Sequence, residues 1–156
     1  MDLYEPRDPA YEARVRASFA RQRAMATIGA RLFAIRPGEV EIELPYRADL
    51  TQQHGYVHGG IIGMIADSAC GYAAYSLMPE DSSVLTVEYK LNLVAPAEGS
   101  RFLARGRVLR PGRTLVVVEG KVMALAADGR EGLIAAMQAT MMTLAGASDA
   151  PRGVVS

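Results

Sequence analysis

Residues 59–77 read GGIIGMIADSACGYAAYSL, and the predicted architecture depends on them. Apolar or small residues occupy nearly every position, so a helix formed here would have no polar face. Pro79 follows and ends the helix, because proline cannot continue it. A helix that is apolar on all sides must be surrounded by protein. The sequence therefore predicts one long buried helix with other elements wrapped around it.

A membrane-spanning helix is the alternative for this stretch, because residues 61–78 have the length of a membrane span. Asp67 lies near the middle of that segment, and Gly63 and Ser68 dilute its apolar character. An acidic side chain is costly in the centre of a lipid bilayer. We therefore expect a helix buried in protein and no membrane attachment.

Segments with the alternating pattern of β-strands flank the apolar helix. Two precede it and four follow it, over residues 28–35, 39–45, 83–95, 101–110, 114–126 and 132–144. Residues 9–25 have the spacing of an amphipathic N-terminal helix. A curved antiparallel sheet around one helix accommodates this order, which predicts an α+β protein with the hot-dog fold. Residues 1–145 form its single domain, and we expect 146–156 to be a disordered tail.

The composition excludes several classes of function. The 17 basic and 17 acidic side chains cancel, so no overall field attracts nucleic acid or an anionic membrane. Cys70 is the single cysteine and the charged N-terminus has no apolar segment of a secretory signal, which together indicate a cytoplasmic protein. Two histidines and one cysteine lack the spacing of metal ligands, and no glycine-rich phosphate loop is present. We therefore expect no metal and no cofactor.

Residues 52–67, QQHGYVHGGIIGMIAD, contain the candidate chemistry. His58, Gly59 and Gly60 lie where a loop enters the helix, and the first turn of a helix has unpaired N–H groups and a partial positive charge. Glycine lets a ligand approach this backbone closely, so the turn suits a carbonyl oxygen that develops negative charge. A tight loop-to-helix turn without further function explains the same residues.

Asp67 is the only charged residue between His58 and Glu80. A buried carboxylate is costly unless it is bonded to a neighbouring group or used in chemistry. Asp67 lies eight residues past Gly59, which is roughly 12 Å along a helix, so it cannot reach a carbonyl held at Gly59 of its own chain. If both groups act on one substrate, two antiparallel helices of a homodimer must supply them.

At these residues the sequence resembles the PaaI-type branch of the hot-dog thioesterases. The family pattern is N-x-x-G-x-x-H-G-G, then six residues and an Asp or Glu, and its places are filled by Gln52, Gly55, His58, Gly59, Gly60 and Asp67. The similarity continues through Thr86-Val87-Glu88, the NLVAPA stretch at 92–97 and the PGRT stretch at 111–114. It covers roughly residues 25–144.

The resemblance implies an acyl-CoA thioesterase that converts an aromatic or medium-chain acyl-CoA to the free acid and CoA, with coenzyme A present only as part of the substrate. It makes Asp67 the nucleophile or general base and the Gly59 N–H the group that polarises the thioester carbonyl. His58 orients the loop, Gln52 takes the place of the family's Asn, and Thr86 holds the attacking water. Homodimers that pair into tetramers are also typical of the family.

The position of Thr86 conflicts with simple strand alternation, which places it with Glu88 and Lys90 on a polar face. A β-bulge or a dimer interface would each explain this. The anionic nucleotide of CoA needs basic partners, for which Arg113 is the first choice. The remaining candidates for binding the substrate are Gly60, Gly112 and Thr114, and the weaker basic candidates are Arg110, Arg107 and Lys90.

Two other functions are open to a chain of this fold. A hot-dog hydratase or dehydratase would use a histidine and an acid near the helix start, and His54 and His58 are available, but the proline-rich segment typical of those loops is absent between Arg47 and Gly60. A non-catalytic acyl-CoA sensor would join this fold to a DNA-binding module. Residues 1–27 supply one helix only, which is too little for a helix-turn-helix.

Overall fold

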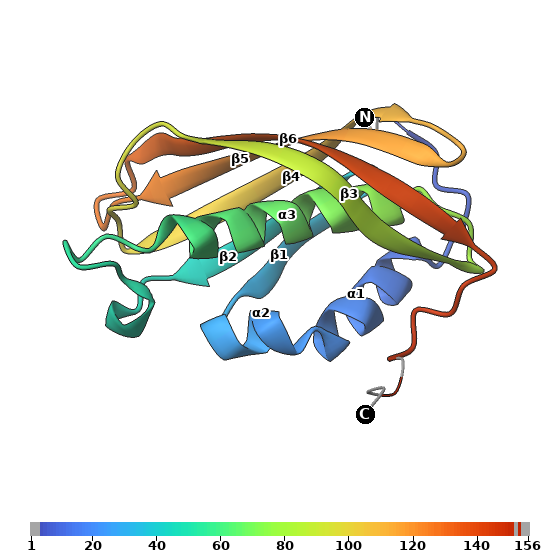
Figure 1. Cartoon of the computed structure of the whole chain (residues 1–156), viewed down its shortest axis with the longest axis horizontal. Coiled ribbons are helices and arrows are strands. Elements are labelled where there is room, and N and C mark those ends of the chain that lie inside the picture. Colours follow the sequence, from blue (N-terminus) through green and yellow to red (C-terminus); the bar gives the residue numbers. More distant parts are fainter. Residues whose placement is uncertain (1–3, 152, 154–156) are drawn as a thin grey trace.

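In a computed structural model that describes residues 4–151 and 153, the apolar helix is α3, Gly59–Tyr75, and one curved sheet wraps around it (Figure 1). The six strands have the order β1-β2-β4-β5-β6-β3, and all neighbouring pairs are antiparallel. Their bounds are β1 Arg31–Arg36, β2 Glu39–Pro45, β3 Ser82–Leu93, β4 Arg101–Pro111, β5 Leu115–Leu125 and β6 Glu131–Ala145. The predicted hot-dog fold is confirmed.

The helix approaches the sheet most closely at two glycines. Gly106 of β4 and Gly120 of β5 are partners in the strand pairing. A Cβ atom at Gly106 would collide with the backbone of Ala69, and one at Gly120 would lie 2.8 Å from the Sγ atom of Cys70. Only residues without a side chain permit this approach. The two glycines thereby bury the centre of α3 and fix its position on the sheet.

The N-terminal segment forms two helices, and the prediction of a single helix over 9–25 is wrong in this respect. α1 spans Tyr11–Arg21 and α2 spans Arg23–Ile28, with a break at Gln22. Met25 and Ile28 of α2 are buried in the core. Their burial across the break stabilises the change of direction, which helical spacing in the sequence cannot reveal.

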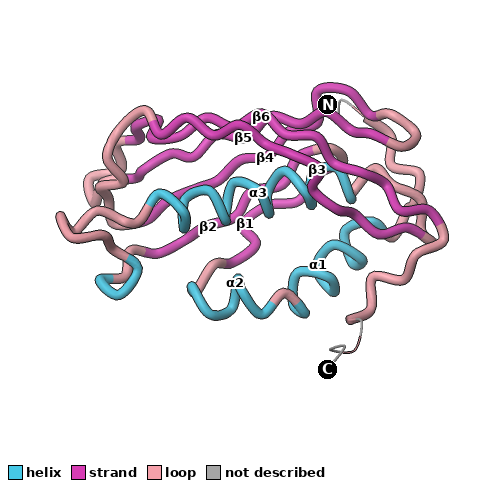
Figure 2. The backbone as a smooth tube through the Cα atoms, in the orientation of Figure 1, coloured by secondary structure: helices cyan, strands magenta, loops and turns pink. Residues whose placement is uncertain are grey.

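Arg14 fastens α1 to the end of α3. Its guanidinium donates hydrogen bonds of 2.8–3.2 Å to the carbonyl oxygens of Tyr75, Met78 and Pro79 and forms an ion pair with Asp8 at 2.8 Å. The last carbonyls of a helix have no partner within it, so a cation is favourable there. α1 therefore lies on the side of α3 that the sheet leaves open (Figure 2).

A bulge in edge strand β3 determines which of its side chains face α3. The pairing with β6 skips Val87, so that Thr86 lies opposite Met141 and Glu88 lies opposite Thr140. A bulge of one residue reverses the alternation beyond it. Thr86 before the bulge and Leu91 after it therefore both face the helix. A β-bulge and a dimer interface were the two explanations for Thr86 lying on the polar face of its strand. The structure contains the bulge.

The described part of the C-terminal tail contacts α1. Asp149, within the stretch 146–156 that we expected to be disordered, forms an ion pair with Arg21 at 2.5 Å. Residues 152 and 154–156 of that stretch lie outside the described residues, as do residues 1–3 of the predicted domain. Within residues 4–151, no helix combines the length and the apolar character needed to cross a bilayer.

Candidate active site

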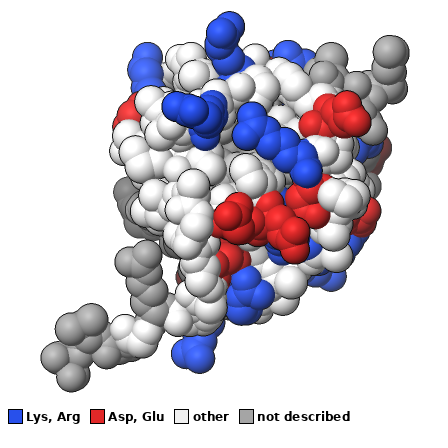
Figure 3. All heavy atoms as spheres, turned by 90° about the vertical axis from the view of Figure 1, so that its right-hand side faces the viewer, with Lys and Arg blue, Asp and Glu red and all other residues white. Residues whose placement is uncertain are grey.

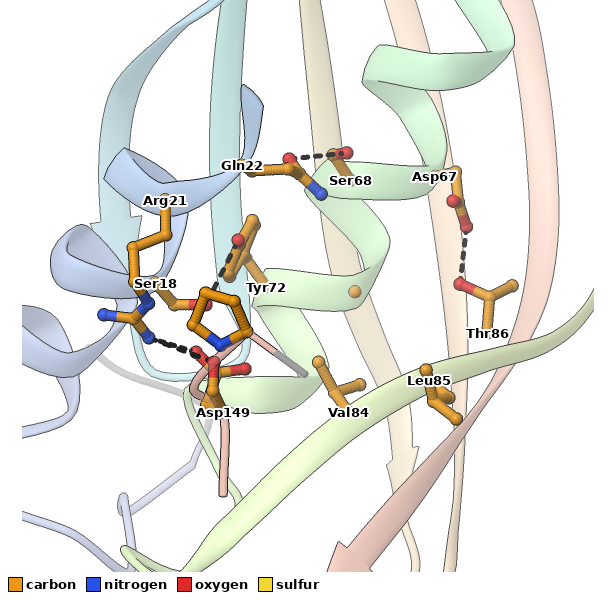
Figure 4. Close-up of a pocket in the computed structure, with 12 residues that line it drawn as sticks. Ser18, Arg21, Gln22, Asp67, Ser68, Tyr72, Val84, Leu85, Thr86 and Asp149 are labelled. Carbon is orange, nitrogen blue, oxygen red and sulfur yellow. Dashed lines mark hydrogen bonds and ion pairs between the residues drawn. The ribbon is translucent and has the colours of Figure 1, made fainter. Parts of the chain in front are cut away.

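Asp67 is half-buried at the middle of α3, beside a pocket of about 420 Å³ that α1, β3 and the C-terminal segment also line (Figure 4). Its Oδ1 atom accepts a hydrogen bond of 2.8 Å from the Oγ1 atom of Thr86. The bulge at Val87 turns this hydroxyl toward the helix. The other carboxylate oxygen, Oδ2, has no protein partner among the described residues. It is therefore free to bind a water molecule or a substrate.

Burial raises the pKa of Asp67 above its ordinary value of 3.8, and the hydrogen bond from Thr86 partly opposes this shift. No cation contributes to the shift. Desolvation without a compensating positive charge makes a carboxylate a stronger base. Such a group is better suited to taking a proton from water than an exposed aspartate would be.

The start of α3 supplies a backbone donor. The Nδ1 atom of His58 accepts a hydrogen bond of 2.9 Å from the Gly60 N–H and so caps the helix. The Gly59 N–H has no acceptor in the described part of the chain. Leu93 of β3 covers this turn, and a Cβ atom at Gly59 would lie 2.5 Å from its Cδ1 atom. Gly59 therefore presents an unpaired N–H beside an apolar side chain.

Gln52 lies near this helix start. The Oε1 atom of Gln52 accepts a short hydrogen bond from the His54 N–H, which uses the side-chain oxygen within the loop. Gln52 and Gly59 line a second pocket of about 420 Å³, together with Ile62, Leu93 and others. The amide nitrogen of Gln52 has no acceptor among the described residues, so it is the group available to a ligand.

Within one chain the two sets of candidate residues do not meet. Asp67 and Thr86 line the first pocket, whereas Gln52 and Gly59 line the second. The separation follows because Asp67 lies eight residues past Gly59 on the helix, which is roughly 12 Å of axial rise. Each pocket therefore contains half of the predicted site.

Of the residues predicted to bind CoA, Gly60 lies at the helix start and donates its N–H to His58, whereas those of the PGRT stretch form a third group. Gly112 and Arg113 lie in the turn between β4 and β5 and line a pocket with Tyr4 and Met78. A Cβ atom at Gly112 would collide with the Leu115 carbonyl, so the turn requires glycine. The structure does not bring these residues to Asp67 or to Gly59 of the same chain. At the end of the molecule seen in Figure 3, basic and acidic side chains are interspersed.

Four polar residues beside Asp67 escaped the sequence analysis. They are Ser18 of α1, Gln22 at the break between α1 and α2, and Ser68 and Tyr72 of α3. Ser68 and Tyr72 lie one and five residues past Asp67 on the same helix, and this closeness in sequence is the one signal that could have identified them. Ser18 and Gln22 reach the pocket only through the packing of α1 on α3, which no local pattern encodes.

Among the described residues, neither Cys70 nor a group of metal ligands forms a second centre. Cys70 is fully buried, and burial raises the pKa of its thiol to about 12, so it is not a nucleophile. Among residues 4–151 no three His, Cys, Asp or Glu side chains come together as a metal site. The Asp67 pocket and the helix start therefore hold the reactive groups considered below.

Comparisons with known proteins agree with this geometry. The sequence model of the thioesterase superfamily matches residues 54–127, which include Asp67 and Thr86. The crystal structure of a thioesterase family protein from Silicibacter pomeroyi is 54% identical in sequence and covers 87% of this chain and 99% of its own, with a TM-score of 0.85. A protein of Saccharolobus solfataricus that is named as an esterase is 36% identical over 63% of this chain and 68% of its own length.

Two more distant proteins extend the comparison. A 1,4-dihydroxy-2-naphthoyl-CoA hydrolase of Listeria monocytogenes is 25% identical over 62% of this chain and 78% of the hydrolase. The E. coli PaaI protein from the phenylacetic acid degradation operon is 15% identical, covers 87% of this chain and 94% of its own, and has a TM-score of 0.76, which shows the shared fold. From the matched residues, the identity and the hot-dog architecture, the chain belongs to the thioesterase superfamily and is a thioester hydrolase.

Proposed function

We propose that this protein hydrolyses the thioester of an aromatic or medium-chain acyl-CoA. The observation that carries the proposal is Asp67: a half-buried carboxylate with a raised pKa, one oxygen bonded to Thr86 and the other open to a pocket. The pocket volume of about 420 Å³ lies within the range of small-molecule sites. The hydrolase from Listeria monocytogenes, whose name states an aromatic acyl-CoA, supports the substrate class.

The reaction follows from these groups. Asp67 takes a proton from a water molecule as the water oxygen bonds to the thioester carbonyl carbon. The carbonyl oxygen becomes negative and accepts a hydrogen bond from a Gly59 N–H. The carbon–sulfur bond then breaks, CoA leaves as a thiolate that takes up a proton, and the acid is released. The raised pKa favours this base role over a nucleophilic one.

The reaction needs two chains, because Asp67 and Gly59 of one chain line different pockets. β3 runs antiparallel to α3: Thr86 contacts Asp67, and Leu93 covers Gly59. A two-fold axis near Tyr89, midway between Thr86 and Leu93, would pair β3 with its copy. Thr86 would then lie opposite Leu93 of the partner subunit, and Asp67 would face Gly59 of the partner subunit.

The exposed edge of β3 supports this arrangement. Its backbone pairs with β6 on one side only, and it carries four large apolar side chains at about half exposure: Leu85, Val87, Tyr89 and Leu93. A long apolar edge strand is a template for pairing with another strand. A second copy of the chain would continue the sheet and bury these side chains. We also expect Arg113 to bind the CoA phosphates, an assignment that rests on the family resemblance.

The test is thiol release from a panel of acyl-CoAs by the wild type and by Asp67→Asn. We expect the variant to remain folded but to lose at least about two orders of magnitude in turnover. Asp81→Asn, an exposed aspartate in the loop before β3, is the matched control and keeps wild-type rates. An enoyl-CoA in the same panel measures hydration, which would indicate the hydratase instead. Near-normal hydrolysis by Asp67→Asn would overturn the mechanism.

A further inference from the structure

The pocket beside Asp67 continues along α3 past the residues assigned to catalysis. It is lined next by Ser68, Gly71 and Tyr72 of α3 and by Ser18 and Gln22 of the N-terminal segment. Tyr72 lies five residues past Asp67, which is roughly 7.5 Å along the helix. A thioester carbonyl placed at Asp67 therefore leaves space along the helix for the acyl group.

Gly71 lines this space. It is inside α3, where glycine destabilises a helix relative to alanine. Glycines at contacts between α3 and the sheet have a packing reason: a Cβ atom at Gly63 of α3 would lie 3.1 Å from Leu91, and one at Gly120 of β5 would lie 2.8 Å from Cys70. Apart from its chain neighbours and the backbone of its own helix, a Cβ atom at Gly71 would meet no atom of the described residues within 4 Å. Packing within the chain does not require glycine here, whereas an acyl group lying across the helix would.

The far wall of the pocket is polar. The Ser18 and Tyr72 hydroxyls form a hydrogen bond of 3.2 Å, and Ser68 Oγ donates to Gln22 Oε1 at 3.3 Å (Figure 4). The break between α1 and α2 directs the Gln22 side chain toward α3. Its amide N–H groups have no acceptor among the described residues. The wall therefore offers a free donor beside a pair of hydroxyls.

The charge of this wall restricts the ligand. Arg21 forms an ion pair with Asp149 at the rim and is thereby neutralised. Burial raises the pKa of Tyr72, so its hydroxyl stays protonated. With Asp67 at the other end, an anionic acyl terminus would be repelled, and a purely apolar one would offer the Gln22 amide no acceptor. A neutral hydroxyl can accept a hydrogen bond from the Gln22 amide and form one with the Ser18–Tyr72 pair.

We propose that Gln22, with the Ser18–Tyr72 pair, selects an acyl group that ends in a neutral hydroxyl and lies across Gly71. The inference rests on the proposed function, because it takes the thioester carbonyl to lie at Asp67. Gln22 and Tyr72 are then specificity-determining residues that the N-terminal segment and α3 add to the site. Hexanoyl-CoA and 6-hydroxyhexanoyl-CoA are matched probes that differ only in the terminal hydroxyl.

The experiment measures kcat/KM for both probes in the wild type, Gln22→Met and Tyr72→Phe. We expect the wild type to prefer the hydroxylated substrate by roughly tenfold, the effect of one hydrogen bond, and the preference to fall toward one in the variants. Thr27→Val removes a hydroxyl that, among the described residues, bonds the Arg23 carbonyl on α2 alone, and it should keep the wild-type preference. Thermal melting checks that each variant is folded.

A second measurement locates the chain on the helix. Gly71→Val fills the space above Gly71, so it should lower kcat/KM for hexanoyl-CoA by at least about tenfold more than for acetyl-CoA. A fall in the hydroxyl preference in either Gln22→Met or Tyr72→Phe supports the inference. No preference in the wild type, or a preference that survives both substitutions, overturns it.

Failure of the proposed function gives a different result, in which no acyl-CoA is hydrolysed. Binding of the neutral amides hexanamide and 6-hydroxyhexanamide, measured by calorimetry, then decides the inference independently. Amides are used because a free carboxylate would be repelled by Asp67. Tighter binding of the hydroxylated amide by the wild type, lost in Gln22→Met, supports the polar wall. Equal binding of the two amides excludes it.

Discussion

The two regions of α3 that we assign to the active site differ in the kind of group that they offer. At the helix start the group is the unpaired N–H of Gly59, held in place because the His58 side chain caps the next residue. At mid-helix the group is the carboxylate of Asp67, held by the Thr86 hydroxyl. The first depends on where the helix begins, and the second on one side chain and its burial.

The two halves therefore require different substitutions as tests. A backbone donor survives nearly every side-chain replacement, so only a residue without an N–H removes it. A carboxylate is removed by an amide of the same shape. In the proposed dimer the two halves meet only through contact between subunits, because they line separate pockets within one chain.

The largest effect is expected from Tyr89→Arg, which places two like charges at the proposed two-fold axis. The variant should be monomeric by light scattering, and thiol release should fall by about 10³-fold because each pocket loses its other half. Phe33→Arg is the matched control, since Phe33 is a similarly exposed aromatic residue on the opposite edge strand β1. That variant should stay dimeric and active. A fully active monomer of Tyr89→Arg would contradict the two-chain site.

Gly59→Pro is expected to lower turnover by about 10²- to 10³-fold, because it removes the N–H that stabilises the oxyanion. Proline is well tolerated at the first position of a helix, and His58 before it has the extended backbone, φ −60° and ψ 136°, that proline requires. Gly59→Ala keeps the N–H and should retain more activity. Equal losses in both variants would point to the packing of Leu93 instead.

Mixing Gly59→Pro with Asp67→Asn tests directly whether the two groups of one site come from different chains. Each variant alone has no complete site, but a mixed dimer has one in which both groups are intact. With equal amounts and random exchange, half of the dimers are mixed and half of their sites work, so about a quarter of wild-type activity should return. No recovery, despite subunit exchange shown by mass spectrometry, would place both groups in one chain.

A smaller effect is expected for Thr86→Val, which leaves Asp67 without its hydrogen bond. Turnover should fall by about tenfold, as for the loss of one hydrogen bond to a charged group. Because the Thr86 hydroxyl lowers the pKa of Asp67, its removal should move the acid limb of the kcat/KM profile to higher pH. Thr86→Ser should restore both the rate and the limb. If the acid limb of the kcat/KM profile were unchanged in Thr86→Val, the Thr86 hydroxyl would have no effect on the pKa of Asp67.

Much of the fold was predictable because it follows from hydrophobic periodicity. The apolar helix at 59–75 and all six strands were expected within three residues of their observed bounds. The burial of Asp67 and its need for a partner also followed from its isolation on that helix. These features depend on local pattern, which the sequence displays directly.

Features that depend on packing were not predictable. The break at Gln22 arises where α1 and α2 both reach the core, although helical spacing runs through it. The bulge that turns Thr86 toward Asp67 could be suspected from a parity conflict, but its position at Val87 required the pairing with β6. The polar wall formed by Gln22 and Tyr72 joins segments far apart in the sequence. Local patterns do not contain such information.

The smallest predicted effect concerns stability and isolates the cost of holding Asp67 at mid-helix. Its pKa in the folded chain is raised by burial, so the wild type loses stability as the pH rises through that value, while below about 3.8 the carboxyl is neutral in both states. Asp67→Asn has no ionisable group at this position, so it does not lose this stability as the pH rises. Its melting temperature should therefore exceed that of the wild type at pH 7, and the two should converge as the pH falls toward 3.8. A lower melting temperature of Asp67→Asn at pH 7 would show that the ionised carboxylate stabilises the fold, contrary to the burial that makes it a base.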